Sequence, residues 1–292
     1  MRRVRALARL AHAVGHGLHG LAIVLFAFPS LDVAGRRERI RWWARKMLAV
    51  LGIAFESEGE PMRRSALVVV NHISWLDIMA VHAIVPEARF VSKADVKSWP
   101  LVARLVDAAG TLYLEREKKR DALRVVHAVV PRARFVSKAD VKAWPLVARL
   151  VDSAGTLYLE RERKRDALRV VHAVAEALTR GQLVAIFPEG TTSTGHGLLP
   201  FHANLMQAAI ATSTPVQPVA LRYSDATHAV SEAVEFVGDT GLFKSLWQTS
   251  CGDGVRAKLT FLPVRASAGL ERRELAAQLR ADIAGALGVQ PA

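Results

Sequence analysis

The sequence is poor in cysteine and in acidic residues. Cys251 is its one cysteine, so no intrachain disulfide can form and no cysteine cluster is available for a metal. A reducing compartment is consistent with this. The 27 acidic residues are outnumbered by 40 Lys and Arg, which leaves a formal charge of +13 and a pI near 10.5. This balance predicts an anionic partner, and nucleic acid and anionic lipid both qualify.

Several signatures that would identify a function class are missing. We find no zinc-finger spacing, no aromatic RNA-binding motif and no basic helix with heptads, so we favour lipid over nucleic acid as the partner. A Gly-x-Ser-x-Gly elbow is also missing, which argues against serine hydrolase chemistry.

Charged residues are missing from Leu10 to Leu31, directly after a start that contains Arg2, Arg3, Arg5 and Arg9. A membrane span needs about 20 apolar residues, but histidines and glycines dilute this stretch, and its strongly apolar part is only Leu21 to Phe28. Three interpretations remain open: a spanning helix, an interfacial helix and a cleaved signal peptide. The mixed basic and aromatic segment 36–46 continues the helical pattern, for contact with headgroups or for packing on the rest of the chain.

Two apolar runs end in polar turns. Ala66 to Val70 leads into Asn71-His72-Ile73-Ser74-Trp75-Leu76-Asp77, and Leu183 to Phe187 leads into Pro188-Glu189-Gly190-Thr191. Such runs predict buried strands, and the carboxyl ends of strands are where open α/β sheets place their sites. An imidazole held by a carboxylate is a suitable general base for an alcohol, so His72 and Asp77 have the required chemistry.

Four blocks in this order resemble the glycerolipid acyltransferase family, of the lysophosphatidic-acid acyltransferase type. The turns at residues 71–77 and 187–191 are blocks one and three. Block two is Gly110-Thr-Leu-Tyr-Leu-Glu115-Arg116, which recurs as Gly155-Thr-Leu-Tyr-Leu-Glu160-Arg161, and block four is Val216 to Ala220. The resemblance covers about Pro61 to Val264.

The resemblance implies transfer of a fatty acyl group from acyl-CoA or acyl-carrier protein to the hydroxyl of a lysophospholipid, with no covalent enzyme intermediate and no cofactor. His72 would be the base and Asp77 its orienting partner. Glu189, Gly190 and Thr191 would position the acceptor, and Arg161 or Arg116 would hold its phosphate.

Thr192 departs from the family pattern, which commonly has Arg after Glu-Gly-Thr. The leading acceptor is 1-acylglycerol-3-phosphate, which would give phosphatidic acid, and the alternative is another lyso-lipid such as lyso-ornithine lipid. His202, close behind block three, is a weaker candidate for the acceptor pocket.

An internal repeat interrupts the family pattern. Residues 86–130 match residues 131–175 at all but five of 45 positions, which indicates a tandem duplication. Each copy predicts strand, helix, strand, helix, beginning in copy one with the strand Arg89 to Lys93. One copy is surplus. Pro131 interrupts the last helix of copy one, whereas copy two runs on into block three, so we favour Arg161 over Arg116.

These patterns predict an α/β protein with a mainly parallel, mixed sheet flanked by helices. Residues 1–60 would form a basic, membrane-associated helical segment, and residues 61–292 the catalytic domain. The expected location is the cytoplasmic face of the inner membrane, peripheral or single-pass, because the thioester donors are cytoplasmic. A different-class alternative is an inactive membrane-binding protein whose site the duplication has displaced.

Overall fold

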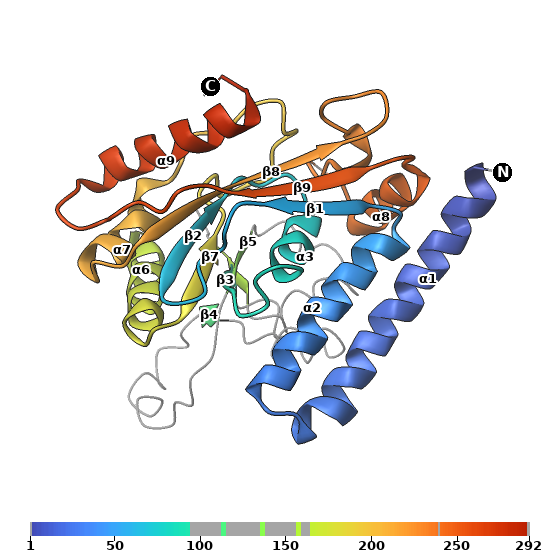
Figure 1. Cartoon of the computed structure of the whole chain (residues 1–292), viewed down its shortest axis with the longest axis horizontal. Coiled ribbons are helices and arrows are strands. Elements are labelled where there is room, and N and C mark those ends of the chain that lie inside the picture. The colour runs from blue at the N-terminus through green and yellow to red at the C-terminus, as the bar shows by residue number, and fades with distance from the viewer. Residues whose placement is uncertain are drawn as a thin grey trace.

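The architecture is a twisted, mainly parallel sheet with helices on both faces, as expected (Figure 1). The computed structural model describes residues 2–93, 112–114, 135–137, 156–158, 164–238 and 240–290. The strands of this part of the chain follow the order β1-β9-β8-β2-β7-β3-β6-β5, and β4 also pairs with β3. Their bounds are β1 Ala54–Glu58, β2 Ala66–Val70, β3 Arg89–Lys93, β4 Leu112–Leu114, β5 Phe135–Ser137, β6 Thr156–Tyr158, β7 Leu183–Ile186, β8 Val216–Ser224 and β9 Arg256–Phe261.

The strand directions bring three carboxyl ends to one edge of the sheet. β2 is parallel to both β7 and β8, and the pair β8–β9 is antiparallel. The turns that follow β2 and β7 therefore lie side by side, where the sequence predicted the site. β1, which lies before the domain boundary expected at residue 60, pairs in parallel with β9 and belongs to the sheet.

The alternation of side chains along β2 divides the core into two layers. Val68 and Val70 face the layer covered by α2 (Val33–Val50), α3 (Leu76–His82) and α8 (Leu242–Cys251). Leu67 and Val69 face the layer covered by α6, α7 and α9. The bounds of these last helices are Lys164–Thr179, Met206–Ala211 and Arg272–Leu287. Because β2 is buried on both faces, it is a continuous apolar run.

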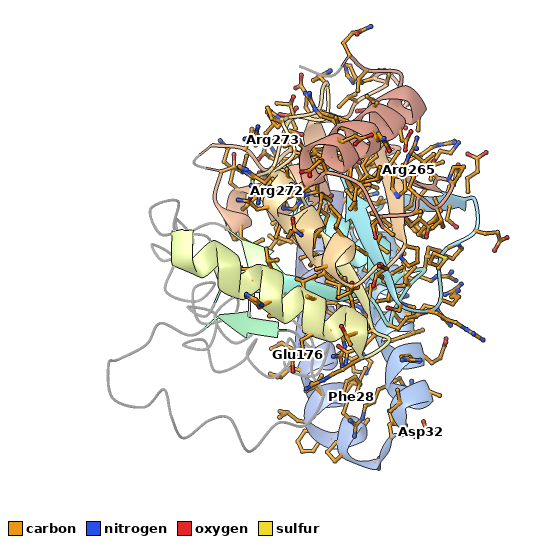
Figure 2. All side chains as sticks on the ribbon, turned by 90° about the vertical axis from the view of Figure 1, so that its left-hand side faces the viewer. Phe28, Asp32, Glu176, Arg265, Arg272 and Arg273 are labelled. Atoms are coloured by element: carbon orange, nitrogen blue, oxygen red, sulfur yellow. The ribbon has the colours of Figure 1, made fainter. Side chains whose placement is uncertain are left out.

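The N-terminal segment is a helical hairpin packed on the first layer. α1 (Arg2–Ala22) continues through a π-helical turn, Ile23–Ala27, and a 3₁₀ turn, Phe28–Ser30, before α2 returns along it (Figure 1). Figure 2 shows Phe28 and Asp32 at the connection, at the end of the molecule away from Arg272 and Arg273. The Asp32 carboxylate caps α2 by accepting a hydrogen bond from the Gly35 N–H.

The hairpin is tied internally and to the sheet domain by side chains. The His16 ring stacks on Trp43, and the Trp43 indole donates to the His16 carbonyl over 3.0 Å. Arg9 donates to the carbonyls of Ser250 and Gly252 at the end of α8, at 3.2 and 2.7 Å. His16, one of the histidines that dilute the apolar stretch, therefore has a packing role. Arg9 caps α8, a helix of the sheet domain.

Both copies of the repeat contribute strands to the part of the sheet beyond β7. β3 and β4 belong to copy one, and β5 and β6 are their counterparts in copy two. β4 pairs with β3 over residues 91–93 in even register, whereas the pairing of β6 with β3 shifts between Ser92 and Lys93. The predicted strands of the repeat are thus confirmed, and α6 leads from copy two into β7. The predicted helix Trp99 to Asp107 and the interruption at Pro131 lie outside the described residues.

Candidate active site

His72 and Asp77 form a hydrogen-bonded pair at the carboxyl end of β2. The His72 Nδ1 lies 2.7 Å from the Asp77 Oδ2. Because a carboxylate can only accept, Nδ1 carries the hydrogen, and Nε2 of the neutral ring is left to take up a proton. The His72 side chain is 17% exposed and that of Asp77 is fully buried. The pair therefore has the arrangement of a general base with its orienting partner.

Asp77 is held in place by three further donors. Its Oδ2 also accepts the backbone N–H of Ile73 at 2.7 Å and of Ser74 at 2.9 Å. Its Oδ1 accepts the hydroxyl of Tyr223, from β8, at 3.0 Å. These donors satisfy the hydrogen-bonding capacity of the buried carboxylate and offset the cost of its burial.

Glu189 joins the two motif turns. Its Oε1 accepts the N–H of His72 at 2.7 Å, and its Oε2 accepts the N–H of Leu199 at 3.0 Å. The Ser193 N–H also donates to the His72 carbonyl at 2.8 Å. The prediction that the two turns meet is confirmed, since the two motifs are bonded to one another. Glu189 braces the loops, and its part in positioning the acceptor stays a prediction.

Burial changes the acidity of this brace. Glu189 is only 3% exposed, and desolvation raises the pKa of its carboxyl group above the ordinary value. The backbone N–H groups of His72 and Leu199 act in the opposite direction but do not outweigh the burial. The charged brace is therefore maintained at some cost in stability.

An aromatic ring covers one face of the His72 imidazole. Phe187, the last residue of the apolar run in block three, stacks on His72 with ring centroids 4.1 Å apart and planes 13° apart. Phe90 in turn stacks on Phe187 at 5.7 Å. These rings restrict the orientation of His72 and shield it from water on that side.

The turn at Gly190 needs glycine for two reasons. Its φ is +66°, and a Cβ at this position would lie 2.8 Å from the ring of His202. His202 is exposed and donates its N–H to the Pro188 carbonyl at 2.8 Å, so the weaker candidate lies beside block three. Thr191 is half-buried in the same turn.

The Thr192 side chain does not provide an anion-binding group. Its hydroxyl donates to the carbonyl of Phe236, in a segment that also contains Glu232 and Glu235. Burial raises the pKa of Glu235, and the nearby Glu232 adds to this effect. Thr192 therefore supplies no positive charge at the position where the family commonly has Arg.

The arginines predicted to hold the acceptor phosphate lie outside the described residues. This applies to both Arg116 and Arg161, so the preference for Arg161 stays a prediction. Tyr223, by contrast, was not predicted. It lies three residues beyond the end of block four, and the one signal for it in the sequence is a polar hydroxyl at the end of an apolar run.

The chain was compared with known proteins. A sequence model of the Acyltransferase family matches residues 54–134 and again residues 127–222. The chain is a member of the glycerolipid acyltransferase family. The two matches overlap at residues 127–134, across the junction of the repeat copies between Val130 and Pro131, as expected for an acyltransferase that contains a duplicated segment.

Named relatives of this acyltransferase differ in acceptor. It is 31% identical over 294 residues to a lyso-ornithine lipid O-acyltransferase of Pseudomonas aeruginosa, covering 98% of this chain and 95% of the relative. It is 32% identical over 232 residues to a 1-acyl-sn-glycerol-3-phosphate acyltransferase of Neisseria meningitidis, covering 78% and 72%.

The fold of the acyltransferase is that of a solved relative. The crystal structure of a 1-acyl-sn-glycerophosphate acyltransferase from Thermotoga maritima matches with a TM-score of 0.62 at 16% identity, covering 99% of this chain and 97% of that chain. This likeness confirms the predicted fold class.

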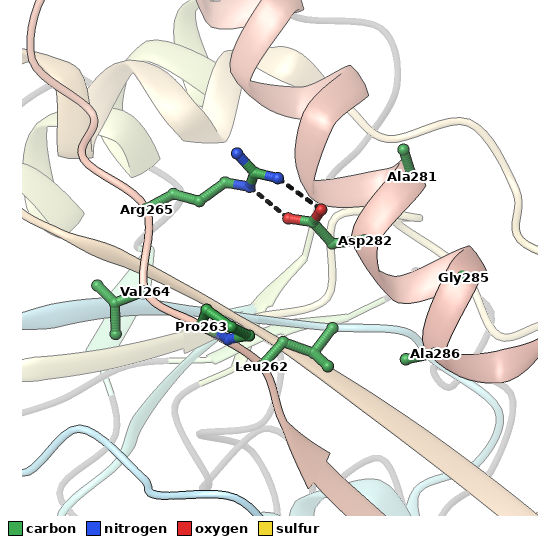
Figure 3. Close-up of a pocket in the computed structure, with 8 residues that line it drawn as sticks. All are labelled: Leu262, Pro263, Val264, Arg265, Ala281, Asp282, Gly285 and Ala286. Carbon is green, nitrogen blue, oxygen red and sulfur yellow. Dashed lines mark hydrogen bonds and ion pairs between the residues drawn. The ribbon is translucent and has the colours of Figure 1, made fainter.

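Two surface cavities are separate from the motif turns. One of about 640 Å³ lies between α9 and the segment after β9, where Arg265 makes a bidentate ion pair with Asp282 (Figure 3). The other, of about 600 Å³, is lined by residues that include Ser65, Leu178 and Thr212. Since no residue of blocks one or three lines either cavity, we assign neither of them to the reaction.

Proposed function

We propose that this acyltransferase moves a fatty acyl group from a thioester to the free hydroxyl of a lyso-lipid, with His72 as general base. The observation that carries this proposal is the 2.7 Å contact between His72 Nδ1 and Asp77 Oδ2, next to the turn that contains Glu189. Acyl transfer to an alcohol needs a base of this kind, because a hydroxyl is a poor nucleophile at neutral pH.

In the proposed reaction, Nε2 of His72 accepts the proton of the lipid hydroxyl as its oxygen bonds to the thioester carbonyl carbon. The carbon–sulfur bond then breaks, and the imidazolium returns the proton to the departing thiolate. Asp77 keeps the ring in the required tautomer and stabilises the imidazolium. Acyl-CoA and acyl-carrier protein are both chemically suitable donors.

Thr192 favours an acceptor without a phosphate. The ornithine headgroup of lyso-ornithine lipid carries an ammonium and a carboxylate but no phosphate. Near Thr192 the charged groups include Glu235 and Glu232, which would repel a phosphate and tolerate an ammonium. The relative from Pseudomonas aeruginosa supports the same acceptor. We therefore propose lyso-ornithine lipid ahead of 1-acylglycerol-3-phosphate, which the sequence alone favoured.

The test of the acceptor is a competition assay. Purified enzyme is given acyl-CoA and equal amounts of lyso-ornithine lipid and lysophosphatidic acid. We expect transfer to lyso-ornithine lipid, and Thr192→Arg should move the ratio of products toward phosphatidic acid by about tenfold, the value of one charge-assisted contact. Thr194→Arg, at an exposed position two residues on, is the matched control. Wild-type preference for lysophosphatidic acid would refute this choice of acceptor.

We also propose that the hairpin of α1 and α2 lies in one leaflet and does not cross the membrane. The helical run Arg3–Ser30 is long and apolar enough to cross, since an 18-residue stretch within it has a mean hydropathy of 1.5. However, α2 returns along α1, so a crossing would draw the exposed Arg36, Arg37 and Arg39 into hydrocarbon. Each would cost at least about 2.5 kcal/mol.

The contacts of α1 also bear on the remaining alternative, a cleaved signal peptide. Arg9 caps α8, and the Arg5 guanidinium lies 3.0 Å from the Asp253 carboxylate. These contacts support a helix that stays with the enzyme. A peripheral position on the cytoplasmic face of the inner membrane would keep the site in contact with both cytoplasmic thioesters and membrane lipid.

The alternative of an inactive membrane-binding protein is tested by thiol release. Wild-type enzyme should release thiol from acyl-CoA in the presence of lyso-lipid, and His72→Ala should reduce the rate by about 10²- to 10⁴-fold. His172→Ala, which removes an exposed histidine on α6, should leave the rate unchanged. Equal rates for wild type and His72→Ala would remove His72 as the base.

A further inference from the structure

The fourth donor to Asp77 comes from a strand outside the two motif turns. Tyr223 lies on β8, 146 positions beyond Asp77 in the chain, and its hydroxyl donates to the Oδ1 of Asp77 at 3.0 Å. Both side chains are fully buried. The other three donors to Asp77 all reach Oδ2, so Tyr223 is the described residue that bonds to the second carboxylate oxygen.

Asn71 explains how Tyr223 is held in this position. The regular pairing of β2 with β8 ends at Val70 and Val219. Beyond that point the Asn71 amide continues it, since its Nδ2 donates to the Leu221 carbonyl at 2.9 Å and its Oδ1 accepts the Leu221 N–H at 2.7 Å. Tyr223 is two residues further on and therefore lies on the same face of the strand as Leu221. The first residue of block one thus sets the position of β8 beneath Asp77.

The hydroxyl of Tyr223 is suited to act only as a donor. Burial, together with the neighbouring Asp77, raises the pKa of Tyr223 well above its ordinary value, so the phenol keeps its proton throughout the working range. Glu189, another titratable group, interacts with both His72 and Asp77.

We infer that Tyr223 is a positioning residue for the acyl transfer, acting through Asp77 on His72. Its hydroxyl fixes the plane of the carboxylate and withdraws part of the negative charge that Oδ2 presents to the imidazole. This inference rests on the proposed role of His72 as the base. It adds a residue that lies outside the four blocks and makes no contact with the reacting atoms.

The substitution Tyr223→Phe removes the hydroxyl and keeps the ring. Without this donor, Asp77 carries more negative charge toward His72, and the imidazolium is stabilised relative to the neutral base. We expect kcat to fall about tenfold with KM unchanged, because the Asp77 carboxylate no longer has a fixed plane and orients the His72 imidazole less well. The acidic limb of the pH profile of kcat/KM should move to higher pH by roughly 0.5 unit.

The matched control is Ser267→Ala, which removes another buried hydroxyl remote from the site, where Ser267 donates to the Ala209 and Thr214 carbonyls. It should lower the melting temperature without moving the pH profile. A second variant, site-specific 3-fluorotyrosine at position 223, preserves the packing and makes the hydroxyl a stronger donor. Its acidic limb should move to lower pH.

Thiol release by the full-length enzyme measures all of these variants, whichever lyso-lipid is the acceptor. Opposite shifts for Tyr223→Phe and for fluorotyrosine would support the inference. The inference would be overturned by an unmoved pH profile in the fluorotyrosine enzyme or in folded Tyr223→Phe enzyme. This includes the case in which Tyr223→Phe only loses stability, as Ser267→Ala does. If His72→Ala retains full activity, His72 is not the general base. That result is distinct from an unmoved pH profile in the Tyr223 variants.

Discussion

At the scale of single residues, the candidate site combines groups that local pattern could identify with groups that it could not. His72, Asp77 and Glu189 stand out in the sequence because polar residues at the ends of apolar runs are unusual. The N–H of Leu199 has no such signal, and the position of Tyr223 at the end of an apolar run does not reveal its partner, although each group bonds to a motif carboxylate. These partners depend on which loops and strands meet.

The raised pKa of Glu189 leads to a prediction about stability and pH. The folded protein holds the proton of Glu189 more tightly than the unfolded chain does, so this group's contribution is complete below its ordinary pKa of 4.5. The contribution is lost as the pH rises through the raised pKa. We therefore expect the free energy of unfolding of the wild type, relative to Glu189→Gln, to decrease between pH 4.5 and 7.

Urea unfolding at a series of pH values measures this difference. Glu176→Gln, at an exposed position on α6 that is labelled in Figure 2, serves as the control, because its carboxylate is 59% exposed and paired with Arg180. A wild-type advantage over Glu189→Gln that grows with pH would contradict the prediction, since it would mean that the hydrogen bonds outweigh the burial.

At the scale of elements, α1 is amphipathic, and apolar residues lie on its exposed face. Its exposed face carries an apolar stripe at helical spacing, formed by Val4, Leu7, Val14 and Leu18, and Phe26 extends this stripe toward the connection with α2. Its other face packs on α2 and α8. An exposed apolar stripe of this kind is typical of a helix that lies in a membrane interface.

We predict that Leu18→Ser combined with Phe26→Ser weakens binding to vesicles that contain anionic lipid. These side chains are 60% and 80% exposed, and burying one fully contributes about 1.5–3 kcal/mol. Partial insertion of the two should therefore change the partition coefficient by at least about tenfold. Val264→Ser, at an exposed position after β9, is the control in the same sedimentation assay. Equal partition of both variants would place the membrane contact elsewhere.

At the scale of the whole molecule, the duplication is the feature that sets this chain apart from the family pattern. Strands from both copies pair with β3, and the family model matches the chain twice, with the two matches overlapping across the junction of the copies. The two units differ at only five positions, and block two occurs in each of them. One copy therefore contains all that the family pattern needs.

We predict that deletion of residues 86–130, or of residues 131–175, leaves a folded and active enzyme. The first deletion joins Val85 to Pro131 and replaces the buried Ala88 and Phe90 by their equivalents Ala133 and Phe135. Its main local change exchanges Glu87, which lies 3.7 Å from Arg63, for Arg132. The Arg63 side chain of this pair is 52% exposed and that of Glu87 is 13% exposed, so its loss costs on the order of 1 kcal/mol.

The two deletions control for one another, since each retains the unit that the other lacks. Solubility, melting temperature and thiol release should be similar for both. Loss of activity in both would show that the second unit is needed. Loss in one deletion alone would point to the five positions at which the units differ, because both products retain an Arg at the same place in block two.

The sequence by itself determined the strands around the site, the order of the motifs, the duplication and the apolar N-terminal stretch. Each of these depends on residues close together in the chain, where burial and turn chemistry leave a periodic pattern. The tertiary structure alone decided that Glu189 braces His72, that Tyr223 reaches Asp77 and that α2 returns along α1. These contacts join segments up to 146 positions apart, and they exist because parallel strands bring their carboxyl ends to one edge only after the sheet has assembled.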